Sequence, residues 1–160
     1  MSRKQDAASR RVWYQEGLRF ECTRCGRCCR DREVPSYVFL REEDIRTLAE
    51  HLGLSRHGLL ETHCEPQDDC YVLRNRPGAC VFYDDDRGCL VYEARPVQCR
   101  TWPFWPYNLR RKNWEEAAEF CPGCNRGALH PREAIEYACR QMLGGCGDGS
   151  LWPGEIPLAE

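Results

Sequence analysis

The pattern of apolar and polar positions predicts helices on both sides of a β-rich middle segment. Residues 40–52 place apolar side chains on one helical face, with acidic residues in the first turn, and Gly53 can end this helix. Residues 131–143 form another predicted helix, with Pro131 at its first position. Shorter helical segments are expected over about 55–63 and 114–120.

The middle of the chain contains three short apolar runs separated by residues that favour turns. The runs are CYVL (70–73), CVFY (80–83) and CLVY (89–92), and we interpret them as a short antiparallel β meander. Residues 95–107 contain three prolines and cannot form a regular helix. The predicted fold class is α+β: a small metal-stapled domain with a short antiparallel meander, peripheral helices and long irregular loops.

The predicted core is small for a chain of this length. The hydrophobic fraction of 42% includes 13 cysteines, and the mean hydropathy is -0.68. Small domains with a thin core usually need disulfides or a metal for stability. We expect a polar N-terminal leader over 1–16, a cysteine-cluster metal-binding domain over 17–146 and an irregular C-terminal tail over 147–160.

The cysteine count and the N-terminal sequence favour a metal over disulfides. Thirteen is an odd number, and the first residues contain no apolar stretch typical of an export signal. No segment approaches the length of a membrane span. A cytoplasmic protein is therefore expected, because the cytosol keeps thiols reduced and available to metals. The net charge of -2 gives no general attraction to nucleic acid, although residues 1–32 contain nine Arg or Lys against four Asp or Glu.

The strongest pattern is Cys22-x-x-Cys25-x-x-Cys28-Cys29. Each Cys-x-x-Cys turn presents two sulfurs to one ion, so successive turns wrap a loop around a metal or a cluster. The side chains of the adjacent Cys28 and Cys29 are expected to diverge, which favours two neighbouring centres, or one centre and a thiol with another role. A vicinal or local disulfide is the alternative.

Four further cysteines lie beside predicted turns or near prolines. Together with the first four they make eight candidate ligands, enough for two four-thiolate centres: Cys22, Cys25, Cys28, Cys29, Cys80, Cys89, Cys99 and Cys121. Two zinc ions or two [4Fe–4S] clusters on eight thiolates both leave a formal charge of about -4, so charge does not select the metal. Arginines near the sulfurs can offset that charge: Arg24, Arg27, Arg30, Arg95 and Arg100.

Residues 20–32 and 79–104, with Cys121-Pro122-Gly123, resemble the YkgJ-type CxxCxxCC family of cysteine-cluster proteins, described as a zinc- or iron-chelating domain. The matching text is Phe20-x-Cys22-x-x-Cys25-Gly26-x-Cys28-Cys29, Cys80-Val81-Phe82 and Cys89-Leu90-Val91-Tyr92-Glu93-x-Arg95-Pro96-x-x-Cys99-Arg100-x-x-Pro103-Phe104. The resemblance implies that the eight cysteines above are those of the family. A similar domain in flagellin lysine N-methylases implies an enzymatic role in some members.

The remaining cysteines depart from the family pattern. Their roles stay open at this point, and they are Cys64, Cys70, Cys124, Cys139 and Cys146. Asp84-Asp85-Asp86 suggests either a divalent-cation site or, as we prefer, a solvated hairpin turn. Trp102, Phe104, Trp105 and Tyr107 are interpreted as a lid over the core around the metal, with ligand stacking as the alternative.

Three functional hypotheses follow from these patterns. The first is a metal-binding protein that holds zinc or iron, including an iron–sulfur cluster, in a structural or chelating role. The second is a redox or methyl-transfer enzyme component with an iron–sulfur centre, and the third a zinc-dependent nucleic-acid or protein interaction module. Cys22, Cys25 and Cys28 with the distant Cys121-Pro122 are similar to the ferredoxin arrangement, which gives a slight preference for iron.

Overall fold

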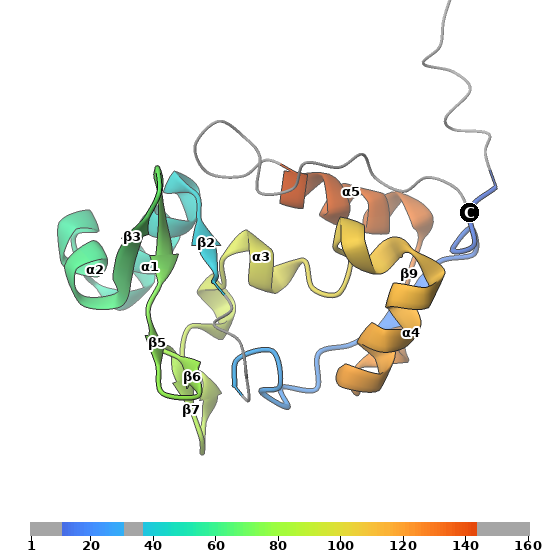
Figure 1. Ribbon diagram of the computed structural model, residues 1–160, viewed down its shortest axis with the longest axis horizontal. Coiled ribbons are helices and arrows are strands. Elements are labelled where there is room, and N and C mark those ends of the chain that lie inside the picture. Colours follow the sequence, from blue (N-terminus) through green and yellow to red (C-terminus); the bar gives the residue numbers. More distant parts are fainter. Residues whose placement is uncertain (1–10, 31–36, 144–160) are drawn as a thin grey trace, which may run out of the picture.

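The computed structural model describes residues 11–30 and 37–143. Residues 1–10 of the expected leader, the expected tail over 147–160 and Cys146 lie outside the described residues. Figure 1 shows two groups of elements, on the left and on the right, with α3 between them. The segment that carries Cys22 to Cys29 runs along the lower side of the molecule between these groups (Figure 1).

The described residues form five α-helices, and most of them match the helical patterns in the sequence. Their bounds are α1 Glu42–Leu52, α2 Arg56–His63, α3 Val97–Arg100, α4 Arg111–Phe120 and α5 Arg132–Leu143. Two 3-10 turns, η2 Tyr92–Ala94 and η3 Pro106–Leu109, lie on either side of α3. The proline-rich segment thus contains only one short helix, as expected from its missing amide donors.

Local signals in the sequence define the ends of α1 and α2. The backbone amide of Arg41 donates to Asp44 Oδ2 over 3.0 Å at the start of α1. Gly53 ends the helix with φ 66°, and the amide of Leu54 donates to the carbonyl of Ala49. The hydroxyl of Ser55 caps α2 by accepting from the amide of Gly58.

Short antiparallel strands form four small sheets. The strands are β1 Leu18–Phe20, β2 Phe39–Leu40, β3 Cys64–Gln67, β4 Cys70–Leu73, β5 Asn75–Arg76, β6 Ala79–Cys80, β7 Tyr83–Asp84, β8 Gly88–Cys89 and β9 Cys124–His130. β4 lies between β2 and β3, while β1 pairs with β9, β5 with β6 and β7 with β8. The predicted α+β class, with short antiparallel strands and peripheral helices, is confirmed.

Two of the predicted strands are wrong in detail. The run 70–73 is β4, but the runs 80–83 and 89–92 contribute only their end residues to three different short strands. Val91 has φ -114° and ψ 31° and begins the turn η2, so its burial comes from packing instead of strand pairing. An apolar run of four residues cannot distinguish these two kinds of burial.

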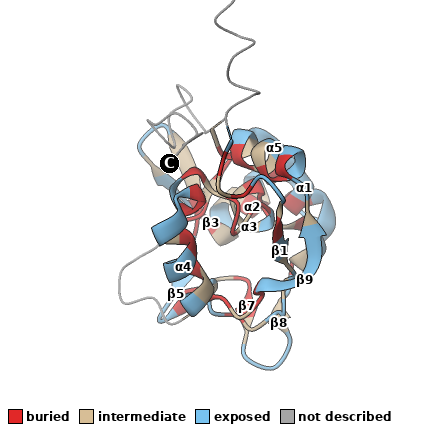
Figure 2. Ribbon diagram, turned by 90° about the vertical axis from the view of Figure 1, so that its right-hand side faces the viewer, coloured by how far each residue is buried: buried red, intermediate tan, exposed pale blue. Residues whose placement is uncertain are grey.

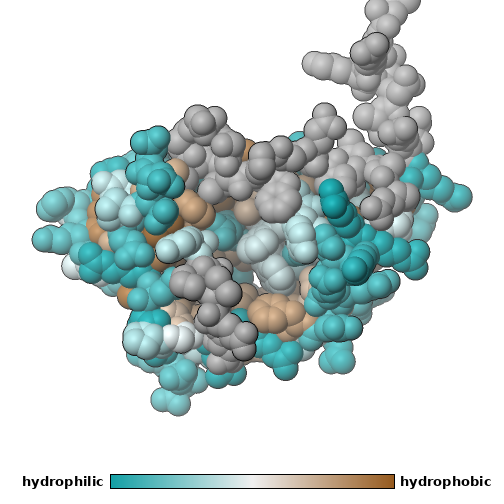
Figure 3. Space-filling view, in the orientation of Figure 1, coloured by the Kyte–Doolittle hydropathy of each residue, from teal (hydrophilic) through white to brown (hydrophobic). Residues whose placement is uncertain are grey.

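The core is divided into two hydrophobic clusters. The first cluster comes mainly from α1, α2 and the strands β2, β3, β4, β6 and β7, and includes Ile45, Leu48, Leu59 and Phe82. The second cluster comes from α4, α5 and the segment before β1, and includes Tyr14, Trp114 and Ile135. Figure 2 shows buried positions on the inner sides of α4 and α5, while much of β9 is exposed. On the face drawn in Figure 3, apolar surface forms only small patches among hydrophilic residues.

Candidate metal centre

All eight cysteines proposed as ligands line one cavity of about 100 Å³. Cys29, Cys89 and Cys99 pack against the first hydrophobic cluster, which contains the buried Cys80. Cys121 belongs to the second cluster. The cavity is therefore located where the two clusters approach each other, and its thiols come from both.

The loop that carries the first four cysteines depends on Gly26. This residue has φ 74°, and a Cβ atom there would collide with the ring of Tyr83. Only glycine adopts this backbone conformation at little cost. The amides of Cys29 and Arg30 both donate to the carbonyl of Gly26, over 2.9 and 3.0 Å, so the chain turns tightly at the vicinal pair.

This tight turn corrects the expectation that the side chains of Cys28 and Cys29 diverge. Their Sγ atoms lie 3.7 Å apart. Adjacent side chains point to opposite faces in a strand, whereas residues in a turn need not do so. The pKa of the Cys29 thiol is raised, first by the hydrogen bond with Cys28, then by burial and by the nearby Cys99 and Cys80.

Backbone hydrogen bonds place Cys80 and Cys89 at the same cavity. The amide of Cys80 donates to the carbonyl of Cys29 over 2.7 Å, next to a bridge between Arg30 and Ala79. Cys89 lies opposite Tyr83 in the β7–β8 pair. The two cysteines therefore lie in separate two-stranded sheets, and not in the two paired strands of one hairpin.

Cys99 lies on α3. The buried carboxylate of Asp44 attaches this helix to α1. Asp44 is 2% exposed, and its Oδ1 accepts from the amide of Val97 over 3.0 Å. The guanidinium of Arg100 lies 3.6 Å from the same oxygen. Because Asp44 also accepts from the amide of Arg41, one side chain joins the start of α1 to the helix that carries Cys99.

Cys121 follows α4, and the pKa of its thiol is lowered. The pKa is lowered to about 5, first by the hydrogen bond with Cys124 and then by Trp102 and two backbone amides, against the opposing effect of burial. The Trp102 indole N–H is buried and has no acceptor in good hydrogen-bonding geometry, although it lies close enough to the Cys121 sulfur to affect its pKa. A thiolate or a cluster sulfide in the cavity would give this donor an acceptor.

Tyr92 connects the cavity to two arginines. Its hydroxyl donates a hydrogen bond to the sulfur of Cys22, which together with burial raises the pKa of Tyr92. The guanidinium carbons of Arg24 and Arg95 lie 3.9 and 3.7 Å from the centre of the Tyr92 ring. This arrangement places two positive charges against the ring of Tyr92, whose hydroxyl contacts Cys22.

The arginines expected near the sulfurs are only partly found there. Arg24, Arg27 and Arg95 line the cavity, whereas Arg30 and Arg100 do not. Arg27 donates to the carbonyl of Phe120 over 3.0 Å, next to Cys121. Of the four residues expected as a lid, Trp102 and Trp105 line the cavity, while Phe104 belongs to the second cluster and Tyr107 is exposed.

The eight cysteines suit a thiolate-bound metal, both in their donor atoms and in their positions around one cavity. Eight sulfurs around one cavity match the donor preference of zinc and of iron–sulfur clusters. Within residues 11–30 and 37–143, no three His, Cys, Asp or Glu side chains already converge on a single coordination point. Binding would therefore require side-chain rotations that bring the sulfurs together.

The cysteines outside this set occupy different positions. Cys64 is a buried free thiol on β3, and Cys70 on β4 is in a disulfide, so these two do not pair with each other. Burial raises the pKa of Cys64 to about 11 and that of Cys139, in the second cluster, to about 12. Cys124 contacts Cys121 but does not line the cavity.

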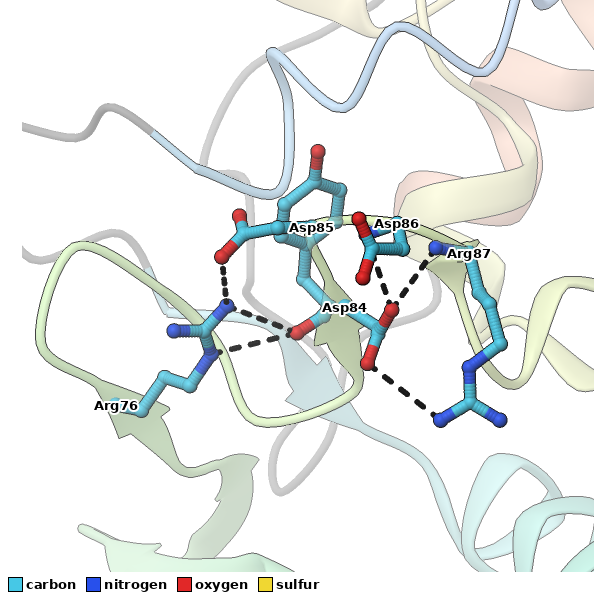
Figure 4. Close-up of polar contacts among 6 residues, drawn as sticks. Arg76, Asp84, Asp85, Asp86 and Arg87 are labelled. Atoms are coloured by element: carbon cyan, nitrogen blue, oxygen red, sulfur yellow. Dashed lines mark hydrogen bonds and ion pairs between the residues drawn. The ribbon is translucent and has the colours of Figure 1, made fainter.

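The Asp84-Asp85-Asp86 segment forms a hairpin turn. Asp84 Oδ1 accepts from the amides of Asp86 and Arg87, and the hydrogen bond from the Arg87 amide is the main cause that holds the pKa of Asp84 below its usual range. Figure 4 shows Asp84 directed toward Arg87 and Asp85 directed toward Arg76, with ion-pair distances of 3.5 and 3.7 Å. Two of the carboxylates are thus paired with arginine, as in a turn and not as in a cation site.

Comparison with known families gives one match. The model of the CxxCxxCC family, described as "Putative zinc- or iron-chelating domain", matches residues 21–122. The chain belongs to the CxxCxxCC family. Its matched region starts just before Cys22 and ends just after Cys121, so it contains all eight cysteines and excludes Cys124. No solved structure matches this chain.

The CxxCxxCC match confirms the resemblance inferred from the motifs and supports binding of zinc or iron. Among the described residues, no helix has both the length and the apolar character needed to cross a bilayer. Sequence reasoning missed the roles of Tyr92 and the Trp102 indole, because their proximity to Cys22 and Cys121 arises only from folding. Tyr92 belongs to the segment Leu90-Val91-Tyr92-Glu93 of the family motif, but the apolar run 89–92 predicted a strand there and no contact with a cysteine.

Proposed function

We propose that this chain is a metal-binding protein that holds zinc or iron through the thiolates of Cys22, Cys25, Cys28, Cys29, Cys80, Cys89, Cys99 and Cys121. The observation that carries this proposal is that all eight side chains line a single cavity. Four of them lie within eight residues of one loop, and the others come from β6, β8, α3 and the end of α4. Burial of so many thiols around one space is the expected arrangement for a thiolate-bound metal.

The metal has a structural role in this proposal. Cys80 belongs to the first hydrophobic cluster and Cys121 to the second, so a centre bound by both groups of thiols would hold the two clusters together. Structural thiolate sites contribute folding free energy on the order of 10 kcal/mol. That contribution is comparable with the whole stability of a typical domain, about 5–15 kcal/mol.

The thiols support a reducing, cytoplasmic location. Eleven of the twelve described cysteines are free thiols, and Cys70 is the exception. A reducing compartment maintains this state, and it also keeps thiolates available for zinc or iron. The same cavity could hold iron as an iron–sulfur cluster, in which case hydrogen bonds from Tyr92 and Trp102 to sulfur would influence the reduction potential.

Replacement of single cysteines tests the proposal. Cys25→Ser and Cys89→Ser should each lower the metal bound per chain, because both side chains line the cavity. Cys139→Ser is the matched control, since this thiol is fully buried in the second cluster and remote from the cavity lining. Metal content is measured by elemental analysis of anaerobically purified protein. Equal metal loss in all three variants, or none in any of them, would contradict the assignment.

A further inference from the structure

The cavity opens to solvent along the cysteine loop. Among the residues that line it, the exposed ones are Thr23, Arg24, Arg27, Cys28 and Phe120. Four of these five lie within one stretch of six residues, so the opening is located on the loop itself. The other seven cysteines of the cavity are half-buried or buried. A ligand that enters from solvent therefore meets the sulfur of Cys28 before the other sulfurs.

Two guanidinium groups flank this opening. The side chain of Arg24 is 62% exposed, and its guanidinium carbon lies 3.9 Å from the centre of the Tyr92 ring. Glu93 lies 3.8 Å from this guanidinium, which is too far for a hydrogen bond. Arg27 donates through Nη1 to the carbonyl of Phe120 over 3.0 Å. Because a guanidinium has five N–H donors in a planar fork, both arginines retain donors for an entering acceptor.

The charges and donor atoms at the opening define the kind of molecule that fits it. Eight thiolates with two zinc ions carry a formal charge of about -4, which repels an anion unless cations at the opening offset it. Guanidinium forks bind carboxylates through paired hydrogen bonds. Displacement of a thiolate from the metal requires another soft donor, and a thiol supplies one. The opening thus suits a small molecule that carries both a carboxylate and a thiol.

We propose that the metal ion enters and leaves the cavity by exchange with an anionic low-molecular-weight thiol at the opening formed by Arg24, Arg27 and Cys28. This inference rests on the proposed function and adds the route by which the site is loaded and emptied. Arg24 and Arg27 bind the carboxylates of the entering molecule. Its thiol loses a proton as its sulfur binds the metal, and Cys28 gains a proton as its own bond to the metal breaks. No electron is transferred, and delivery of the metal is the same exchange in reverse.

The rate of zinc release from the loaded protein tests this exchange. Transfer of zinc to a coloured chelator is measured with mercaptosuccinate, with the neutral thiol thioglycerol at equal thiolate concentration, and with succinate, which has no thiol. We expect release to be about fivefold faster with mercaptosuccinate than with thioglycerol, because of two exposed ion pairs, and this advantage should shrink at high salt. Succinate should have no effect. Equal rates with the two thiols, or release accelerated by succinate, would overturn the proposal.

Substitution of the two arginines locates the effect. Arg24→Gln with Arg27→Gln should lower the ratio of the mercaptosuccinate rate to the thioglycerol rate from about five to about one. Arg46→Gln with Arg140→Gln is the matched control, because it removes the same charge from two exposed arginines outside the cavity lining. An equal decrease in both double variants would overturn the proposal, since net charge alone would then explain the advantage.

Labelling of the released sulfur tests the role of Cys28. A pulse of iodoacetamide during the exchange, followed by peptide mass mapping, should label Cys28 before the buried Cys80. Earlier labelling of Cys80 would place the exchange elsewhere in the cavity and overturn the proposal. The proposed function fails in a different way, because it is contradicted by a chain that binds no zinc. A zinc-loaded chain with equal rates for the two thiols contradicts only this inference.

Discussion

Replacing Gly26 by alanine tests the link between the backbone of the cysteine loop and the rest of the fold. Gly26 has φ 74°, and an added Cβ would collide with the side chain of Tyr83, including its hydroxyl and ring carbons. Tyr83 is buried in the first hydrophobic cluster and lies opposite Cys89 in the β7–β8 pair. Neither the ring nor the loop can move without disturbing residues that line the cavity.

The magnitude follows from two separate costs. A non-glycine residue in the left-handed region loses about 1–2 kcal/mol, and overpacking against a buried side chain costs typically about 1–3 kcal/mol more. Gly26→Ala should therefore lower the free energy of unfolding by about 2–5 kcal/mol. Gly53→Ala is the matched control, because Gly53 has φ 66° and nothing lies within 4 Å of an added Cβ. This control should lose only the conformational part, about 1–2 kcal/mol.

The assay is urea or thermal unfolding of both variants in parallel, together with their metal content. Each kcal/mol corresponds to a shift in Tm of about 2–4 °C for a chain of this size. Gly26→Ala should also bind less metal, because its turn positions Cys25 and Cys28, while Gly53→Ala should keep its metal. The reasoning is refuted if the two variants lose the same stability, or if Gly26→Ala keeps full metal content.

Three further predictions concern other contacts of the site. Asp44→Ala should lower the free energy of unfolding by roughly 2–4 kcal/mol, because the amides of Val97 and Arg41 lose their buried acceptor. Urea unfolding measures this loss, and a value under about 0.5 kcal/mol would show that this carboxylate does not attach α3 to α1. Tyr92→Phe should keep the metal but shift the sulfur-to-metal charge-transfer band of cobalt-substituted protein to lower energy, because the Cys22 sulfur loses a hydrogen bond. An unchanged spectrum would show that Tyr92 does not contact a metal-bound sulfur. Removal of the metal with a chelator should lower Tm and abolish the near-ultraviolet circular dichroism of the aromatic residues around the cavity. A metal-free protein that kept its full Tm would contradict the structural role.

The parts of the fold that local sequence predicted are those with local causes. α1 has its apolar face, its acidic first turn and its terminal Gly53 within one stretch of sequence, and its observed bounds differ from the prediction by only two residues at the start. α5 has comparable local signals and begins one residue after the predicted start. The strand over 70–73 was also found as predicted, because its β-branched and aromatic residues lie between clear turns.

The parts that the sequence did not predict depend on contacts between distant segments. β1 pairs with β9, so that Leu18 lies opposite His130, and no local pattern indicates a pairing over more than a hundred residues. The segment 124–130 is polar and mostly exposed, which hides it from a search for apolar periodicity. The approach of Cys28 to Cys29 likewise depends on the turn at Gly26, where the ring of the distant Tyr83 leaves no space for a Cβ atom.

The gathering of the eight cysteines was easier to predict than the strands around them. Spacing and resemblance were sufficient to select eight cysteines, and these eight line one cavity. The hydrogen bond from Tyr92 to Cys22 and the position of the buried Trp102 indole beside Cys121 could not be predicted, because each depends on how distant segments approach one another in three dimensions.

The most direct test of metal binding through these cysteines is elemental analysis, with an absorption spectrum, of protein made and purified without oxygen in the presence of ample iron and zinc. We predict stoichiometric zinc or iron: a colourless protein with about two zinc ions per chain, or a brown protein with iron and acid-labile sulfide. In either case the eight thiols of the cavity should react with a thiol reagent only after the metal is removed. A folded chain that carries neither metal, and whose cavity thiols react at once, would contradict the account.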